Sequence, residues 1–143
     1  MNETDGKGAA PDQETYFAYS ASVRIFGVIP DLDELTRRLG VLPTSSHRKG
    51  DRRTPSSQPY QHDMWLYKVS IKEDAPLHVH IDELWNVFRL RRDCLLDLKK
   101  NLTVDVFLGY RTNCQTAGVE VPHQSLEIFR ELQIPFGLSI ILT

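Results

Sequence analysis

The sequence is poor in cysteine and in net charge, and both shortages exclude functions. Its 143 residues include two cysteines, Cys94 and Cys114, which lack the spacing of metal ligands. Because a cytosolic pair of this kind is more often reduced than bridged, we expect free structural thiols rather than a disulfide or a redox centre. The formal net charge is only −2, with a pI near 6.2. The absence of a basic excess argues against nucleic acid as a partner.

Long apolar runs are also missing. No stretch approaches the roughly 20 apolar residues that a membrane-spanning helix needs, so no membrane partner is predicted. The segment Met1 to Thr15 is polar and lacks the apolar centre of a signal peptide, which makes a cytoplasmic location the expectation. Residues 1–14 contain almost nothing to bury and predict a disordered tail. Residues 15–143 suit a single domain with one core.

Apolar periodicity indicates both strands and helices. Tyr16 to Val28 alternates with a period of two, which predicts a strand. A short helix is expected next, with Asp31 as its N-cap, a stripe of leucines on one face, and Gly40 as its end. Further strands are expected at residues 64–71, 102–110, 119–121 and 136–142, and a last helix is expected from Pro122 until Pro135 ends it.

The longest expected helix spans Val79 to Lys100. Arg91 and Arg92 interrupt its apolar face, so either the helix bends there or the two side chains lay their stems along the core and keep their charges in water. The element order resembles two β-α-β halves joined by this helix. We therefore predict an α+β fold, with a mainly antiparallel sheet, helices packed on one face, and a ferredoxin-like arrangement.

The most unusual run is L-P-T-S-S-H-R-K-G-D-R-R, from Leu42 to Arg53, which is basic and rich in hydroxyl groups. Arginine binds planar or tetrahedral anions through paired hydrogen bonds, and Gly50 allows a close backbone approach. The run lacks the glycine spacing and the lysine-hydroxyl pair of a P-loop, so no cofactor is predicted. The candidate ligand-binding residues are Thr44, Ser46, His47, Arg48, Lys49 and Asp51. A solvated loop pinned to the sheet by Arg48 and Asp51 is the competing interpretation.

Other candidate chemistry is weaker. A three-histidine zinc site can be drawn from His62, His78 and His80, but no carboxylate or cysteine completes a recognised pattern. A capping or core hydrogen-bonding role for His80 is favoured, and no metal is predicted. Asp82 and Glu83 are adjacent, so a helix directs them apart and they form no acid–base pair. No nucleophile signature is present, and catalytic residues are therefore not assigned.

Several segments in order resemble a known family. They are Y-F-A-Y-S-A-S-V-R-I-F-G, D-L-D-E-L-T-R-R-L-G-V-L-P-T-S-S-H-R-K-G-D, M-W-L-Y, H-I-D-E-L-W, V-D-V-F-L-G-Y and L-E-I-F-R-E-L-Q-I-P-F-G-L-S-I-I-L. On these residues the chain resembles the bacterial family catalogued as domain of unknown function 4279. The resemblance covers nearly the whole chain after the tail. It implies a compact α+β domain and implies no reaction, cofactor or catalytic residue. The stretch from Thr54 to Asp63 departs from the pattern by being longer and richer in proline.

The sequence favours a non-enzymatic binding module. In this hypothesis the loop from Thr44 to Arg53 and the adjacent sheet edge contact an acidic protein or a small anionic ligand. One alternative is a small enzyme whose cleft near this loop uses His47, Arg48 and Asp51. Another is a structural, self-associating domain, because the apolar final strand from Phe136 to Leu142 could pair at a sheet edge and form a homodimer.

Overall fold

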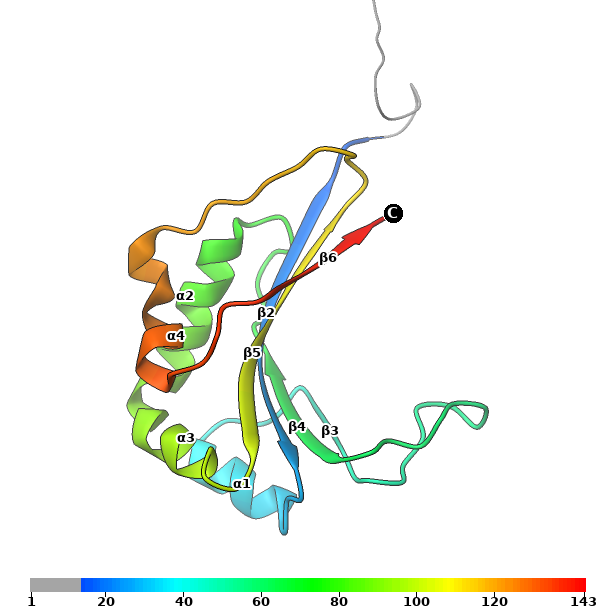
Figure 1. Ribbon diagram of the computed structural model, residues 1–143, viewed down its shortest axis with the longest axis vertical. Coiled ribbons are helices and arrows are strands. Elements are labelled where there is room, and N and C mark those ends of the chain that lie inside the picture. Colours follow the sequence, from blue (N-terminus) through cyan, green and yellow to red (C-terminus); the bar gives the residue numbers. More distant parts are fainter. Residues whose placement is uncertain (1–13) are drawn as a thin grey trace, which may run out of the picture.

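The computed structural model describes residues 14–143, so the predicted tail lies almost entirely outside the described residues. Figure 1 shows one sheet with the helices gathered on one of its faces. The strands are β2 (Phe17–Gly27), β3 (Ser45–His47), β4 (Asp63–Lys68), β5 (Thr103–Thr112) and β6 (Leu138–Leu142). The helices are α1 (Leu32–Leu39), α2 (Leu77–Phe88), α3 (Arg92–Leu98) and α4 (Glu127–Leu132), with 3₁₀ turns η1 (Arg89–Arg91) and η2 (His123–Leu126). Among these residues no helix is long and apolar enough to cross a membrane.

The sheet has five strands in the order β3-β4-β2-β5-β6. The pairs β2–β4, β2–β5 and β3–β4 are antiparallel, whereas β5–β6 is parallel, so the sheet is mixed. The predicted ferredoxin-like arrangement is not confirmed. Strand β3, which the sequence pattern does not predict, carries the chain to the sheet edge before β4 returns beside β2. The two halves therefore differ: β5 and β6 are parallel neighbours across α4, but β4 lies between β2 and β3.

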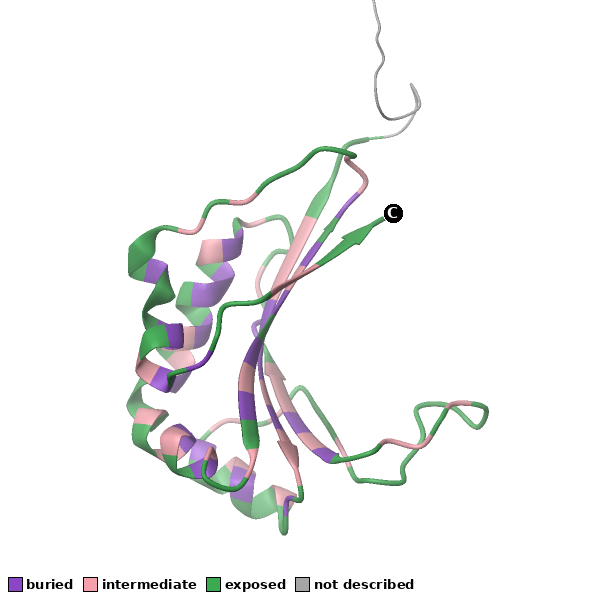
Figure 2. Ribbon diagram, viewed as in Figure 1, coloured by how far each residue is buried: buried purple, intermediate pink, exposed green. Residues whose placement is uncertain are grey.

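Alternating residues of the central strands form the core, as their periodicity predicts. Ala21, Val23 and Ile25 of β2 are fully buried against the helices, and Val104 and Leu108 of β5 lie beside them. Figure 2 shows this alternation along the strands, with buried residues on the inner stripes of the helices. The other face of the sheet carries no helix (Figure 1), so polar side chains of the strands can meet solvent there.

Helix α1 begins and ends where its capping residues predict. The Asp31 carboxylate accepts hydrogen bonds from the backbone N–H groups of Asp33 and Glu34, at 3.0 and 3.1 Å, which satisfies two of the free N–H groups of the first turn. Gly40 follows the helix with φ of 74°, a left-handed conformation that glycine adopts without steric cost. Leu35 and Leu39 are buried on its inner face. This capped helix fixes the path of the chain into β3.

The long helix bends, which is the first of the two expected outcomes. It divides at η1 into α2 and α3, and Leu90 in that turn is 90% exposed. Arg92 leaves the core side to pair with Glu131 of α4 at 2.6 Å. The run of charged residues offers no apolar side chain at the positions that would face the sheet, so the helix changes direction there.

The C-terminal third departs from the predicted elements in its details. Residues 119–121 form no strand, because no neighbouring strand pairs with them. Helix α4 ends at Leu132 with Gln133 at φ of 56°, so it stops before Pro135. Strand β6 lies at the sheet edge and Ile140 is 57% exposed there; self-association through this edge stays a prediction.

The two cysteines follow the sequence prediction. Cys94 and Cys114 are free thiols, each partly buried. Cys94 packs against the hydrophobic core, and neither thiol cross-links the chain.

Candidate functional site

The first residues of the predicted loop, Thr44 to His47, pair with β4 and form the edge of the sheet. The backbone N–H of Thr44 donates to the Leu66 carbonyl at 2.7 Å, and the Thr44 hydroxyl accepts from the Lys68 N–H at 2.8 Å. Ser45, Ser46 and His47 then form β3 against β4. The hydroxyl of Thr44 is therefore already engaged in extending the sheet, while the Ser46 side chain is exposed.

The centre of the loop is held by Asp63. Its nearly buried carboxylate accepts hydrogen bonds from the backbone N–H groups of Lys49 and Ile29, each at 2.8 Å. The Arg48 guanidinium donates to the carbonyls of Ile29 and Pro30 and lies 3.4 Å from the same carboxylate. The N–H of Lys49, then that of Ile29 and the charge of Arg48, lower the pKa of Asp63. Arg48 thus joins the loop to the segment before α1.

The remaining predicted residues also contact their own chain. Asp51 accepts from the Arg48 N–H at 2.9 Å, and the His47 ring stacks on Tyr60 with centroids 3.5 Å apart. Most of these residues belong to the segment 48–62, which projects from the sheet (Figure 1) and contains a β-bridge between Arg52 and Pro59. These contacts do not favour a catalytic cleft built from His47, Arg48 and Asp51. Five of the six predicted residues are exposed, His47 being the half-buried one. Only the side chains of Ser46 and Lys49 have no hydrogen bond, ion pair or stacking partner among residues 14–143.

The helix-free side of the sheet, which we call the open face, offers a different arrangement. Alternate residues of β2, β4, β5 and β6 point to this face. Ser22 of β2, for example, lies opposite Lys68 of β4 on one side and Phe107 of β5 on the other. Arg24 of this face forms a bidentate ion pair with Asp105, at 2.9 and 2.8 Å, and its guanidinium lies 4.6 Å from the centroid of the Phe107 ring. Hydrogen bonding to Asp105 raises the pKa of Arg24. Arg24 is therefore a structural cation that holds Phe107 in place.

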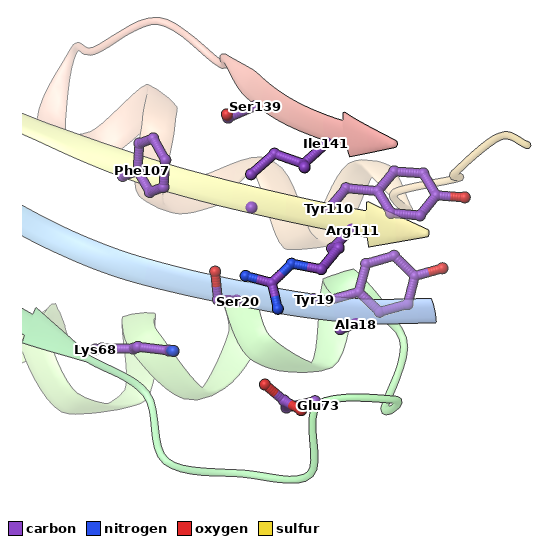
Figure 3. Close-up of a pocket in the computed structure, with 11 residues that line it drawn as sticks. Ala18, Tyr19, Ser20, Lys68, Glu73, Phe107, Tyr110, Arg111, Ser139 and Ile141 are labelled. Carbon is purple, nitrogen blue, oxygen red and sulfur yellow. The ribbon is translucent and has the colours of Figure 1, made fainter. Parts of the chain in front are cut away.

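The open face has a cavity at the next pair of β2 and β5 residues on this face, Ser20 and Gly109, beyond Ser22 and Phe107. Ser20, Gly109 and Ser139 lie side by side on three neighbouring strands, and Gly109 forms the floor of a cavity of about 130 Å³. A Cβ atom at Gly109 would lie 2.6 Å from the Ser20 Oγ, so the cavity depends on glycine. Figure 3 shows the side chains around it. This Gly109 hollow is lined by Ala18, Tyr19, Ser20, Lys68, Glu73, Phe107, Gly109, Tyr110, Arg111, Ser139 and Ile141.

Two cations and one carboxylate surround the Gly109 hollow. Arg111 extends from β5 toward Ser20 on β2, and Lys68 approaches from the end of β4 (Figure 3). Among residues 14–143, neither Lys68 nor Arg111 forms an ion pair, in contrast to Arg24 and Arg48. Glu73 stands at the rim and, over the same residues, pairs with neither cation. The hollow thus combines charges that the described chain leaves unpaired with the hydroxyls of Ser20 and Ser139.

A second depression of about 310 Å³ lies beside the first and shares Tyr19, Lys68 and Glu73 with it. Thr44 lines this depression, so it is the one predicted residue that reaches the region. His80 lies beneath, 1% exposed, and neither ring nitrogen has a hydrogen bond of good geometry within the described chain. Burial lowers the pKa of His80, while the carbonyls of Ala75 and Lys72 oppose that shift in part. The predicted hydrogen-bonding role of His80 is therefore not seen.

The predicted three-histidine set does not assemble. The His62 ring lies near Phe26, tilted, with ring centroids 6.1 Å apart, whereas His80 lies near Tyr19 toward the other end of β2. Within the described part of the chain, no three His, Cys, Asp or Glu side chains are placed to hold a metal ion.

Sequence reasoning missed the Gly109 hollow. The available signal was the glycine within the alternating run V-D-V-F-L-G-Y-R, because an interior strand glycine often marks a close approach to the backbone. Nothing in the sequence around Lys68 or Arg111 indicated a binding site, since each is a single basic residue near the end of a strand. Strand register places them at one cavity, and periodicity does not reveal register.

These features define an α+β protein with one mixed sheet, a helical layer on one face and a polar hollow on the other. The family model described as Domain of unknown function (DUF4279) matches residues 15–143, and the chain belongs to this family. Searches against curated proteins and against solved structures gave no match.

Proposed function

We propose that this protein is a binding module that holds an anionic group in the Gly109 hollow. The observation that carries the proposal is the pair of cations, Lys68 and Arg111, that the described chain leaves without an acidic partner at a cavity floored by glycine. Arginine presents a planar fork that matches a carboxylate, and lysine adds a second positive charge. The hydroxyls of Ser20 and Ser139 can donate further hydrogen bonds.

The size of the hollow restricts the ligand. Drug-sized ligands occupy cavities of roughly 300–1,000 Å³, whereas the Gly109 hollow measures about 130 Å³. It therefore suits a small molecule, or one acidic side chain of a larger partner. Phe107 and Ile141 provide apolar walls, which strengthen the attraction between the cations and a bound anion by lowering the local dielectric.

The loop at residues 44–53 is a second candidate for contact with an acidic protein. The observation that favours it is the projection of residues 48–62 away from the sheet (Figure 1), with Lys49, Arg52 and Arg53 all exposed. Arg48 and Arg52 contribute less to this surface than Lys49 and Arg53, because their guanidinium groups already donate to backbone carbonyls. The loop offers charge without a cavity, which is why the hollow is the leading site.

The first test is an NMR titration with sodium acetate at constant ionic strength, with chloride as the replaced ion. In the wild-type protein we expect acetate to shift the amide resonances of Ser20, Gly109 and Ser139. Replacing Arg111 with glutamine should remove these shifts while the rest of the spectrum is retained. The Lys49→Gln variant is the matched control, since it removes one exposed positive charge from the loop.

The titration also distinguishes the two candidates. Shifts that centre on residues 44–53 and vanish in Lys49→Gln, but persist in Arg111→Gln, would place the anion at the loop and contradict the leading proposal. The anionic group could belong to a free small molecule or to an acidic side chain of a partner protein. A titration with an acidic peptide in place of acetate distinguishes these two sources. A free anion suffices if acetate saturates the site, whereas a protein partner is required if only the peptide does.

A further inference from the structure

We infer that the ligand of the Gly109 hollow carries a cationic amine next to its anionic group, as a free α-amino acid does. This inference rests on the proposed function and deepens it by naming a ligand class. Its starting point is Glu73, a carboxylate at the rim of a cavity that two cations otherwise dominate. Figure 3 shows the Glu73 carboxylate on the same side of the sheet edge as the Lys68 amino group.

Glu73 is held at the rim by its own backbone. The Tyr19 N–H donates to the Glu73 carbonyl at 2.8 Å, and the Val69 N–H donates to the Ala21 carbonyl at 3.0 Å. These two bonds fasten the segment after β4 along β2, where β4 itself has ended. The position of Glu73 beside the hollow is therefore fixed by sheet-like pairing and does not depend on an ion pair of its side chain.

The Glu73 carboxylate does not neutralise either cation of the hollow. No ion pair joins Glu73 to Lys68 or Arg111 within the described residues, although Lys72 and Asp74 in the same segment approach to 3.9 Å. A carboxylate at the rim repels a simple anion, so it weakens a site that serves only anions. The same carboxylate attracts an ammonium group. A ligand with both charges satisfies all three side chains, which is the electrostatic complementarity expected of a specific site.

The walls and the volume agree with a small zwitterion. The volume of about 130 Å³ equals roughly four water molecules at about 30 Å³ each. Phe107 and Ile141 offer an apolar surface for a short aliphatic side chain, while Arg111 and the serine hydroxyls face the carboxylate. A nucleotide or an extended peptide would leave most of its surface outside a cavity of this size.

The inference is tested by titrating four small probes into the full chain and following the amide shifts of Gly109 and Ser139. The probes are L-valine, isovalerate, which lacks the amine, N-acetyl-L-valine, which has no charge on nitrogen, and L-valinamide, which lacks the carboxylate. We expect L-valine to bind about two- to fivefold more tightly than isovalerate or N-acetyl-L-valine, the factor typical of a solvent-exposed ion pair. L-Valinamide should bind most weakly, because Arg111 and Lys68 lose their partner.

Variants identify the residue responsible. Glu73→Gln should bind L-valine and isovalerate equally, whereas Asp74→Asn, which removes a neighbouring carboxylate, should keep the wild-type preference. Glu73→Asp serves as a second variant that retains the charge and should retain part of the preference. Far-UV circular dichroism checks that each variant is folded.

The outcomes separate the two proposals. If all carboxylates bind equally in the wild type, and Glu73→Gln changes nothing, the zwitterion inference is overturned while anion binding stands. If no probe shifts the resonances around Gly109, both proposals fail. A preference for L-valine that survives Glu73→Gln would also contradict the role assigned to this residue.

Discussion

The loop at residues 44–53 and the Gly109 hollow are both basic, but their cations are used differently. In the loop, Arg48 donates to backbone carbonyls and approaches Asp63, so its charge holds the chain. At the hollow, Arg111 and Lys68 surround a cavity and pair with no acid among residues 14–143. Positive charge in a sequence does not by itself indicate a binding site. What matters is whether the folded chain already supplies the partner of each cation.

The largest expected effect comes from the centre of the loop. Replacing Asp63 with asparagine should lower Tm by more than Arg48→Gln or Gly109→Ala does. Lys49 and Ile29 donate their backbone N–H groups to different oxygens of the Asp63 carboxylate, which also faces Arg48. An asparagine amide has one acceptor oxygen, so it keeps one weaker bond and turns its NH2 donor toward the other N–H group. Thermal unfolding followed by circular dichroism measures the loss. A Tm equal to that of the wild type would show that the loop is not held by Asp63.

The pH dependence of stability provides the next test of the loop. The pKa of Asp63 is lowered below its ordinary value of 3.8. Its contribution to stability is therefore complete above pH 3.8 and is lost as the pH falls through the lower value of the folded state. Chemical denaturation between pH 6 and pH 2 should show a shallower acid loss for Asp63→Asn than for the wild type. Parallel curves for the two proteins would contradict this assignment.

The hollow should respond in binding more than in stability. Gly109→Ala should change the free energy of unfolding by no more than about 1 kcal/mol, because alanine suits a strand at least as well as glycine and Ser20 can rotate away. The same variant should abolish the acetate-induced shifts, since the added methyl group fills the floor. Gly137→Ala is the matched control, because a Cβ there meets nothing within 4 Å. Undiminished acetate binding by Gly109→Ala would show that the anion lies elsewhere.

A smaller pH effect should arise beside the hollow. Burial lowers the pKa of His80 below its ordinary value of 6.5, so the neutral ring stabilises the folded state above pH 6.5 and this contribution is lost as the pH falls below it. Replacing His80 with leucine should flatten the stability curve below pH 6.5 and leave the acid loss due to Asp63 unchanged. Denaturant titrations of both proteins at pH 7.5 and pH 5.5 measure the difference. An unchanged pH slope in the variant would show that His80 does not titrate in this environment.

Local signals predicted much of the fold. The alternation in β2 and β5, the Asp31 cap and Gly40 each depend on neighbouring residues, and the structure confirms them. Strand β3 was missed because Ser45, Ser46 and His47 form a short polar edge with no apolar alternation. Its strand conformation comes from pairing with β4, a contact that the local pattern does not contain.

The candidate site was less predictable than the fold. The loop attracted notice because its basic residues are consecutive, but the contacts of Asp63 and Arg48 with Ile29 depend on the tertiary path of the chain. The Gly109 hollow requires three strands in a particular register, including the parallel strand β6. The sequence indicated which residues would point away from the core. It did not indicate which of them would be neighbours on the open face.

The most direct test of the central claim is a crossed comparison of Arg48→Gln and Arg111→Gln. Each variant removes one positive charge, and for each the Tm and the acetate affinity are measured at the same ionic strength. We predict that Arg48→Gln lowers Tm and leaves acetate affinity unchanged, whereas Arg111→Gln leaves Tm unchanged and abolishes acetate binding. The opposite pattern, with binding lost in Arg48→Gln and retained in Arg111→Gln, would contradict the division between a structural loop and a binding hollow.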